Sequence, residues 1–207
     1  MRRIILIRHA KTQGNLEKRY IGQKSDEDIL VSEVEQIGQL SRMFSDYLAG
    51  DISFYLSPMK RCQETYEALV EANVRTFGGR KVQILEELTE IDFGDFEGHN
   101  YKELSGNKDY QEWIDSNGKL PFKNGESQES FIDRSYKAFK TILEDEADTQ
   151  IVVCHGGNIM AIMMRLTAMS YYDFQINNLE GYCINFEYDG EKIDDLSYCS
   201  LSDWLHS

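Results

Sequence analysis

The chain has 207 residues, a length that suits one domain or one domain with a small cap, and 41% of them are hydrophobic, which excludes an extended disordered chain. The formal net charge of −14, with no Lys/Arg-rich block to offset it, argues against a nucleic-acid partner. No apolar run approaches the ~20 residues of a membrane span, so no membrane association is expected.

The first apolar run and the cysteines indicate the compartment. Ile4–Ile7 is shorter than the ~7–15 residues of a secretory signal core, so it predicts a buried first strand. The cysteine spacings match neither a redox CxxC pair nor a zinc pattern, at Cys62, Cys154, Cys183 and Cys199. We therefore expect reduced thiols in a cytoplasmic protein, with no bound metal and no cofactor.

Continuous apolar runs predict four strands, at Ile4–Ile7, Ile52–Leu56, Val82–Leu85 and Ile151–Cys154. Runs without polar alternation are typical of strands buried on both faces, as in a parallel sheet. Amphipathic patterns predict helices over about 32–48, 58–73, 127–147 and 157–168. Strands that alternate with helices indicate an α/β fold, here a three-layer α/β/α sandwich with a mostly parallel central sheet.

Two further segments complete the predicted domain. Residues 181–200 have the pattern of two strands joined by Asp189-Gly190, a hairpin turn signal. Residues from about 97 to 125 are polar, aromatic and poor in periodicity, so we expect them to form a cap excursion. A single domain over residues 1–207 results, because no linker interrupts the chain.

Charged residues follow each predicted strand, at the rim where open α/β sheets bind ligands. Arg8-His9 follows the first strand, Arg61 the second, an acidic segment with Glu90 the third, and His155-Gly156-Gly157 the fourth. Arginines suit a phosphate, a neutral imidazole can attack phosphorus, and a carboxylic acid can protonate the leaving alkoxide. A Gly-Gly pair before a helix lets backbone N–H groups approach the phosphate.

These motifs resemble those of the histidine phosphatase superfamily, also called the phosphoglycerate-mutase-like family. Five blocks stand in the family order: 6–15, 57–65, 90–98, 125–127 and 152–157. Position 10 is Ala where Gly is more usual. Asp28-Ile29-Leu30 followed by Glu33 replaces the usual Pro-Leu-Ser/Thr and downstream Gly, which affects the substrate rim and not the phosphate pocket.

The resemblance implies a role for each motif residue. His9 would be the phosphorylated nucleophile, and Arg8, Arg61 and His155 would surround the phosphoryl group. Asn15 would be a further donor, together with the backbone at Gly156. Glu90 matches the family's proton donor, with Asp92 left open as an alternative acid. Aromatic residues of the cap could line a substrate mouth or simply pack within the cap, namely Tyr101, Tyr110 and Trp113.

The implied activity is that of a metal-independent phosphatase that hydrolyses a small phosphorylated metabolite through a phosphohistidine. The sequence is most similar to the short bacterial phosphatases, including α-ribazole phosphatase. α-Ribazole 5′-phosphate phosphatase specifically and phosphoglycerate mutase remain the alternatives, although mutases of the family are usually longer. A non-catalytic phospho-ligand binder would lack the nucleophile or the acid, and neither is missing. Assembly into a homodimer is left open.

Overall fold

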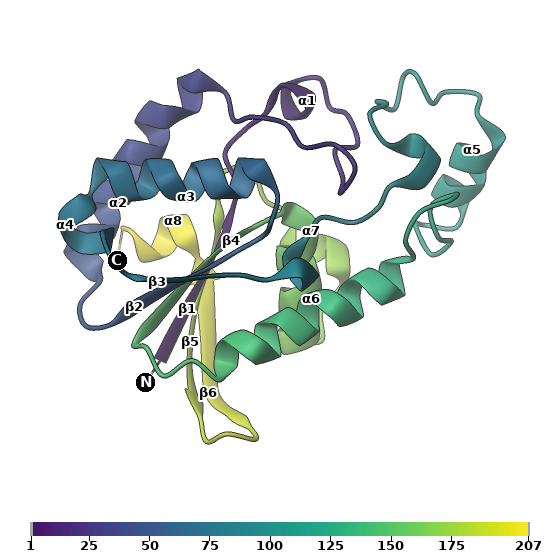
Figure 1. Ribbon diagram of the computed structural model, residues 1–207. Helices are drawn as coiled ribbons and strands as arrows, with labels where there is room; N and C mark the ends of the chain where they lie inside the picture. Colours follow the sequence, from purple (N-terminus) through teal and green to yellow (C-terminus); the bar gives the residue numbers. More distant parts are fainter. Residues whose placement is uncertain (1, 207) are drawn as a thin grey trace.

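A computed structural model describes residues 2–206, which form one six-stranded sheet with helices on both faces (Figure 1). The strands have the order β3-β2-β4-β1-β5-β6. Their bounds are β1 Arg2–Arg8, β2 Ile52–Leu56, β3 Lys81–Ile84, β4 Thr149–Cys154, β5 Gly181–Tyr188 and β6 Ile193–Ser200. The first four of these are parallel, and the β5–β6 hairpin adds to β1 in the antiparallel sense. The predicted α/β sandwich with a mostly parallel sheet is confirmed.

The long helices cover the sheet, and the short ones lie within the loops that connect the longer elements. The α-helices are α1 Gln13–Leu16, α2 Val34–Tyr47, α3 Lys60–Ala72, α4 Val74–Phe77, α5 Lys108–Asp115, α6 Gln128–Leu143, α7 Gly156–Thr167 and α8 Leu201–Trp204. The 3-10 turns are η1 Val31–Glu33, η2 Glu86–Leu88, η3 Gly94–Phe96 and η4 Tyr171–Phe174. Within the described residues, no helix is long and apolar enough to cross a membrane.

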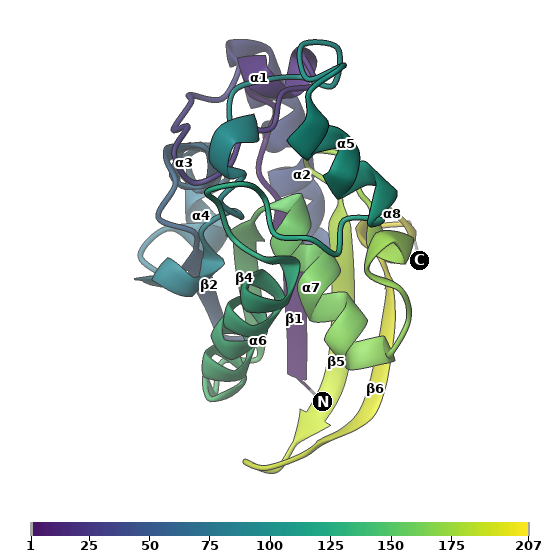
Figure 2. The same ribbon diagram turned by 90° about the vertical axis from the view of Figure 1, so that its right-hand side faces the viewer.

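Strand β1 lies at the centre of the sheet and separates two hydrophobic cores. Its residues Ile5 and Ile7 pack with α2, α3 and α8 on one face. Ile4 and Leu6 pack with α6 and α7 on the other. All four side chains are fully buried, because helices cover both faces of the sheet at this strand (Figures 1 and 2). This burial explains the uninterrupted apolar run in the sequence.

Two details of the predicted sheet are wrong. The run Val82–Leu85 was expected to be a strand buried on both faces, but β3 is an edge strand whose residues are all exposed, with Val82 at 41% and Ile84 at 48%. It pairs only with β2, so one side of the strand faces solvent. The hairpin loop is also longer than Asp189-Gly190: it spans residues 189–192, and the Asp189 carboxylate accepts the N–H groups of Glu191 and Lys192.

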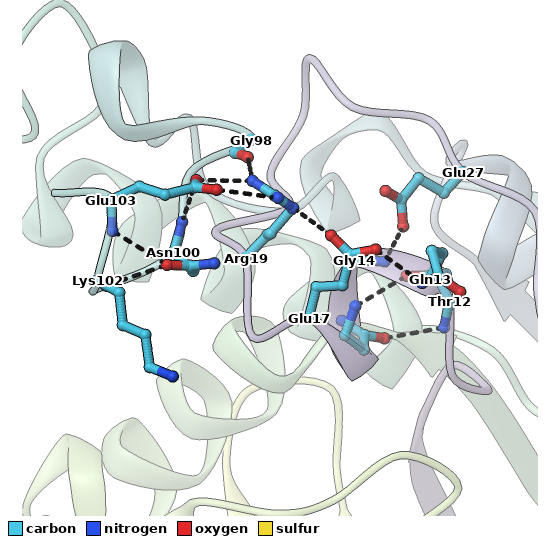
Figure 3. Close-up of polar contacts among 11 residues, drawn as sticks. Thr12, Gln13, Gly14, Glu17, Arg19, Glu27, Gly98, Asn100, Lys102 and Glu103 are labelled. Atoms are coloured by element: carbon cyan, nitrogen blue, oxygen red, sulfur yellow. Dashed lines mark hydrogen bonds and ion pairs between the residues drawn. The ribbon is translucent and has the colours of Figure 1, made fainter.

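Residues 97–125 lie on the same side of the molecule as α1, at the end of the sheet opposite the N-terminus (Figures 1 and 2). A separate apolar cluster joins this segment to α6, through contacts that include Leu104, Tyr110 and Phe122 with Phe131. Figure 3 shows a second connection, in which Arg19 donates to the Gly98 carbonyl (2.6 Å) and to the Glu103 carboxylate (2.7 and 3.0 Å). The segment is therefore attached both to α6 and to the loop after α1 that contains Arg19.

Candidate active site

The structure brings the charged residues of the strand ends together. Arg8 is the last residue of β1 and His9 the next one, and Arg61 lies in the first turn of α3, after β2. Glu90 follows η2, and His155 directly follows β4. The rings of His9 and His155 are 5.1 Å apart between centroids, and both are buried. Parallel strands end at one edge of the sheet, which is why residues so distant in sequence meet here.

The imidazole of His9 is held in one tautomer. Its Nδ1 lies 2.7 Å from the carbonyl oxygen of Ala10. A carbonyl can only accept, so Nδ1 carries the proton and Nε2 keeps its lone pair. Burial, with the positive charges of Arg61 and Arg8, holds the pKa of His9 well below its ordinary value. The ring is therefore neutral at pH 7, as a nucleophile must be.

His155 is held in the opposite tautomer. Arg61 Nε donates to Nδ1 (3.3 Å), so the proton sits on Nε2, which is 2.8 Å from Ser57 Oγ. Burial, followed by the charges of Arg61, His9 and Arg8, keeps the pKa of His155 well below its ordinary value. Ser57 was not among the predicted site residues, although its position directly after β2 was a usable signal.

The fully buried guanidinium of Arg61 is surrounded by main-chain oxygens. It donates to the carbonyls of Ser25 (2.8 Å) and Gly22 (3.2 Å) in the loop that precedes α2. The Glu97 carboxylate fixes the same loop, because its Oε1 accepts the N–H groups of Gly22, Lys24 and Ser25 at 2.9 to 3.1 Å. Glu97 thus holds the loop that holds Arg61.

Arg8 also keeps its charge without a carboxylate partner. Its Nη1 donates to the Ile176 carbonyl (2.8 Å), and its buried Nε has no hydrogen-bond partner among the described residues. Burial lowers the pKa of Arg8 from its ordinary value. Within residues 2–206 neither Arg8 nor Arg61 forms an ion pair. Arg61 is buried and Arg8 half-buried, and cations withdrawn from water without an ion pair are costly, so the two arginines favour an anionic ligand.

Glu90 faces the start of α7. A methyl group on Gly157 would lie 2.6 Å from Glu90 Oε1, so only glycine leaves room for this carboxyl group. Burial raises the pKa of Glu90, against the opposing effects of the Ile91 N–H and of Arg61. Arg134 anchors the segment by donating to the Glu90 carbonyl (3.0 Å) while it forms a two-bond ion pair with Glu126. Nothing in the sequence pattern distinguished Arg134 from an exposed helix charge.

The alternative acid, Asp92, has a different environment. It forms an ion pair with Lys24 (2.8 Å) and accepts the Gly94 N–H (2.8 Å). Although burial raises the pKa of Asp92, these hydrogen bonds lower it overall. An ionised, paired carboxylate is a poor proton donor, so the geometry favours Glu90.

Asn15 and Gly156 lie in the first turns of two helices, α1 and α7. Asn15 caps the first turn of α1: its Oδ1 accepts the Thr12 N–H (3.2 Å) and the Asn178 amide (3.0 Å), and Asn178 also donates to the His9 carbonyl (2.9 Å). The Nδ2 of Asn15 donates to no other described residue. Gly156 begins α7 beside Arg8, whose side chain a methyl group there would approach to 3.5 Å.

A cavity of about 570 Å³ opens from these residues. Arg8, Glu90, Gly156 and Gly157 line it and adjoin one another, and we refer to them as one end of the cavity. The lining also includes six rings that we call the aromatic wall: Tyr20, Phe93, Trp113, Phe122, Tyr171 and Tyr172. Tyr171 adjoins the first group of residues, because its hydroxyl donates to the Gly157 carbonyl.

Of the three cap aromatics singled out in the sequence, only Trp113 lines this cavity. Tyr110 is buried against Phe96, and Tyr101 is exposed. The described part of the chain holds no group of three or more His, Cys, Asp or Glu side chains arranged for a metal ion.

Comparisons with known proteins find relatives that cover most of this chain. A relative from Hydrogenobacter thermophilus that carries the name of a phosphoserine phosphatase is 30% identical over 82% of this chain and 80% of its own. A 2,3-bisphosphoglycerate-dependent phosphoglycerate mutase of Methylorubrum extorquens is 28% identical over 82% and 81%.

The fold has a counterpart among solved structures. The crystal structure of an Escherichia coli protein named as an α-ribazole-5′-phosphate phosphatase superposes with a TM-score of 0.78, at 23% identity, over 90% of this chain and 91% of that one. The sequence model of the histidine phosphatase superfamily (branch 1) matches residues 4–198. The chain belongs to the histidine phosphatase superfamily.

Proposed function

We propose that the protein hydrolyses a small phosphate monoester through a phosphohistidine on His9. The observation that carries the proposal is the tautomer of His9: a neutral imidazole with a free Nε2 stands beside the buried Arg61 and the half-buried Arg8, neither of which forms an ion pair among the described residues. The arginines would bind the phosphoryl oxygens and stabilise charge in the transition state. The proposed ligand is a small phosphorylated metabolite, and a cytoplasmic location remains the expectation.

The reaction would proceed in two steps. In the first, Nε2 of His9 attacks phosphorus while the ester P–O bond breaks, and the Glu90 carboxylic acid protonates the leaving alkoxide. In the second, water attacks the phosphohistidine, Glu90 takes its proton, and the P–N bond breaks to release inorganic phosphate. The raised pKa of Glu90 and the lowered pKa of His9 supply the protonation states that the first step requires.

Hydrolysis by water separates this activity from that of a mutase, which returns the phosphoryl group to a second acceptor. The relationship to a phosphoglycerate mutase keeps that reaction as the second candidate, and α-ribazole 5′-phosphate is one candidate substrate. A coupled assay for 2-phosphoglycerate formed from 3-phosphoglycerate distinguishes the two reactions.

The direct test is to trap the intermediate. Brief incubation with a ³²P-labelled monoester and quenching in base should leave an acid-labile label on the wild-type protein. His9→Ala should lose the label and several powers of ten in turnover, because the nucleophile is gone. His206→Ala, which changes an exposed histidine near the C-terminus, is the matched control and should keep both. A label that persists in His9→Ala would contradict the proposal.

A further inference from the structure

Ionic side chains are confined to one end of the 570 Å³ cavity. Of the residues that line it, only Arg8 and Glu90 are charged groups, and both belong to the end assigned to the phosphoryl group. The rest of the lining is aromatic, aliphatic, glycine or amide. The half that receives the leaving alcohol therefore has no cation to neutralise a carboxylate or a second phosphate there. A buried anion without such a partner is strongly disfavoured, and the net charge of −14 adds to the repulsion.

The aromatic wall is held in a fixed arrangement. Trp113 stacks on Phe122 with ring centroids 4.9 Å apart. Tyr20 packs at a tilt against Phe93 (5.1 Å) and edge-on against Trp113 (6.3 Å). On the opposite side, Tyr171 donates to the Gly157 carbonyl (3.3 Å), which ties that ring to the phosphoryl end. Rings that are already positioned offer stacking surface at little further cost in conformational entropy.

Two glutamines add hydrogen-bonding capacity to this apolar half. The amides of Gln128 and Gln175 line the cavity and pair with no other described side chain or main-chain group. An amide offers both donors and an acceptor, so it can bind the polar edge of a flat ring or a sugar hydroxyl without requiring charge. The cavity volume lies within the ~300–1,000 Å³ of pockets that enclose a drug-sized ligand.

We propose that the substrate is the phosphate monoester of an uncharged alcohol that carries a planar aromatic group and is about the size of a nucleoside. The ring would stack against the aromatic wall, and its polar edge would meet Gln128 and Gln175. Monoesters with a carboxylate beside the phosphate, such as phosphoserine or 3-phosphoglycerate, should be poor substrates. This inference rests on the proposed function, since it assigns the phosphate to the end that holds Arg8.

The test compares kcat/KM for esters of primary alcohols, which limits differences in leaving-group reactivity. The probes are 2-phenylethyl phosphate, n-butyl phosphate, O-phosphoserine and phosphocholine. We expect 2-phenylethyl phosphate to exceed each of the others by at least about tenfold. Equal or better turnover of phosphoserine would overturn the inference, and so would a preference for phosphocholine, which would indicate cation–π binding instead. Failure to hydrolyse even p-nitrophenyl phosphate would count against the proposed function itself.

Variants at the cavity sharpen the test. Tyr172→Ala removes a half-exposed ring of the aromatic wall and should lower kcat/KM for the phenylethyl ester by roughly three- to tenfold, and lower that for the butyl ester by clearly less. Tyr101→Ala is the matched control, because Tyr101 has similar exposure (52% against 45%) and does not line the cavity. Gln175→Arg places a cation in the apolar half and should raise kcat/KM for phosphoserine. Equal losses on both esters in Tyr172→Ala would contradict ring stacking.

Discussion

The two ends of the cavity are built in different ways. Next to the phosphoryl end, Arg61, His9 and His155 are buried behind the residues that line the cavity. Arg61 and His155 bond each other and remote segments, and the His9 ring is fixed by the neighbouring Ala10 carbonyl. At the other end, the aromatic wall comes from loops and from the 97–125 segment, and its rings are held by packing. The comparison teaches that the chemistry is built into the strand ends of the fold, whereas substrate choice depends on segments that can change without disturbing the sheet.

Among the substitutions that leave the nucleophile in place, replacing the acid at the phosphoryl end should have the largest effect. Glu90→Gln should slow alkyl phosphates by roughly 10²–10⁴-fold, the usual contribution of acid catalysis. The rate of p-nitrophenyl phosphate hydrolysis should fall much less, because its leaving group departs without a proton. In the wild type, the alkyl rate should fall as pH rises through the raised pKa of Glu90, and this fall should vanish in the variant.

The exposed Glu86→Gln is the control for this measurement and should leave both substrates unaffected. Equal losses on the alkyl and aryl esters in Glu90→Gln would mean that Glu90 only positions the substrate, and Asp92 would become the next candidate.

Arg61→Lys tests whether the buried guanidinium acts through its geometry. Lysine is a point charge that cannot reach the Ser25 and Gly22 carbonyls and His155 together. We expect a loss of at least ~1.4 kcal/mol in transition-state stabilisation, or tenfold in kcat/KM. Arg165 lies on α7 and forms an exposed ion pair with Asp133 of α6, so Arg165→Lys should be neutral. A kcat/KM close to that of the wild type in Arg61→Lys would count against direct contact between the Arg61 guanidinium and the phosphate.

Glu97 extends the comparison to the loop that holds Arg61. Glu97→Ala removes the acceptor of three N–H groups and should lower the free energy of unfolding by about 1.5–3 kcal/mol, the range for hydrogen bonds to a charged group. kcat/KM should fall less than in Arg61→Lys, and Glu97→Gln should recover part of the loss. Urea unfolding alongside kinetics measures both. If Glu97→Ala and the exposed Glu112→Ala behave alike, the loop does not depend on this carboxylate.

Removing metal should have the smallest effect. The cationic charge that phosphoryl transfer needs is present in Arg8 and Arg61, so incubation with EDTA should leave kcat/KM unchanged. Activity that vanishes in EDTA and returns with Mg²⁺ or Zn²⁺ would show that the arginines alone are not sufficient.

The parts of the fold that rest on long apolar runs could be predicted from the sequence. Ile4–Ile7 is uniformly apolar because it is covered on both faces, and strand-end residues such as His9 and His155 follow from where such runs stop. Strand β3 could not be classified correctly, since Val82 and Ile84 are apolar in both an edge strand and a central one. The difference lies in the neighbours of the strand, which its own residues do not encode.

The residues that support the site were beyond prediction for a related reason. Arg134 and Glu97 act by bonding main-chain groups of remote loops, and Asn178 bridges Asn15 and the His9 carbonyl across the chain. Arg134 and Asn178 lie outside the five family blocks, and Glu97, although inside the block 90–98, has no sequence signal for a carboxylate that holds a remote loop. The aromatic wall likewise combines rings from segments as distant as Tyr20 and Tyr172, and a sequence shows only that both residues are aromatic.

The hydrogen bond between His9 Nδ1 and the Ala10 carbonyl has a consequence for detecting the intermediate. The two ring nitrogens of histidine give two phosphorylated isomers, which differ in ³¹P chemical shift and are distinguished by isomer-specific antibodies. With Nδ1 committed to the main chain, the phosphoryl group should be attached only to Nε2. The trapped protein should therefore react with an antibody against 3-phosphohistidine and not with one against 1-phosphohistidine.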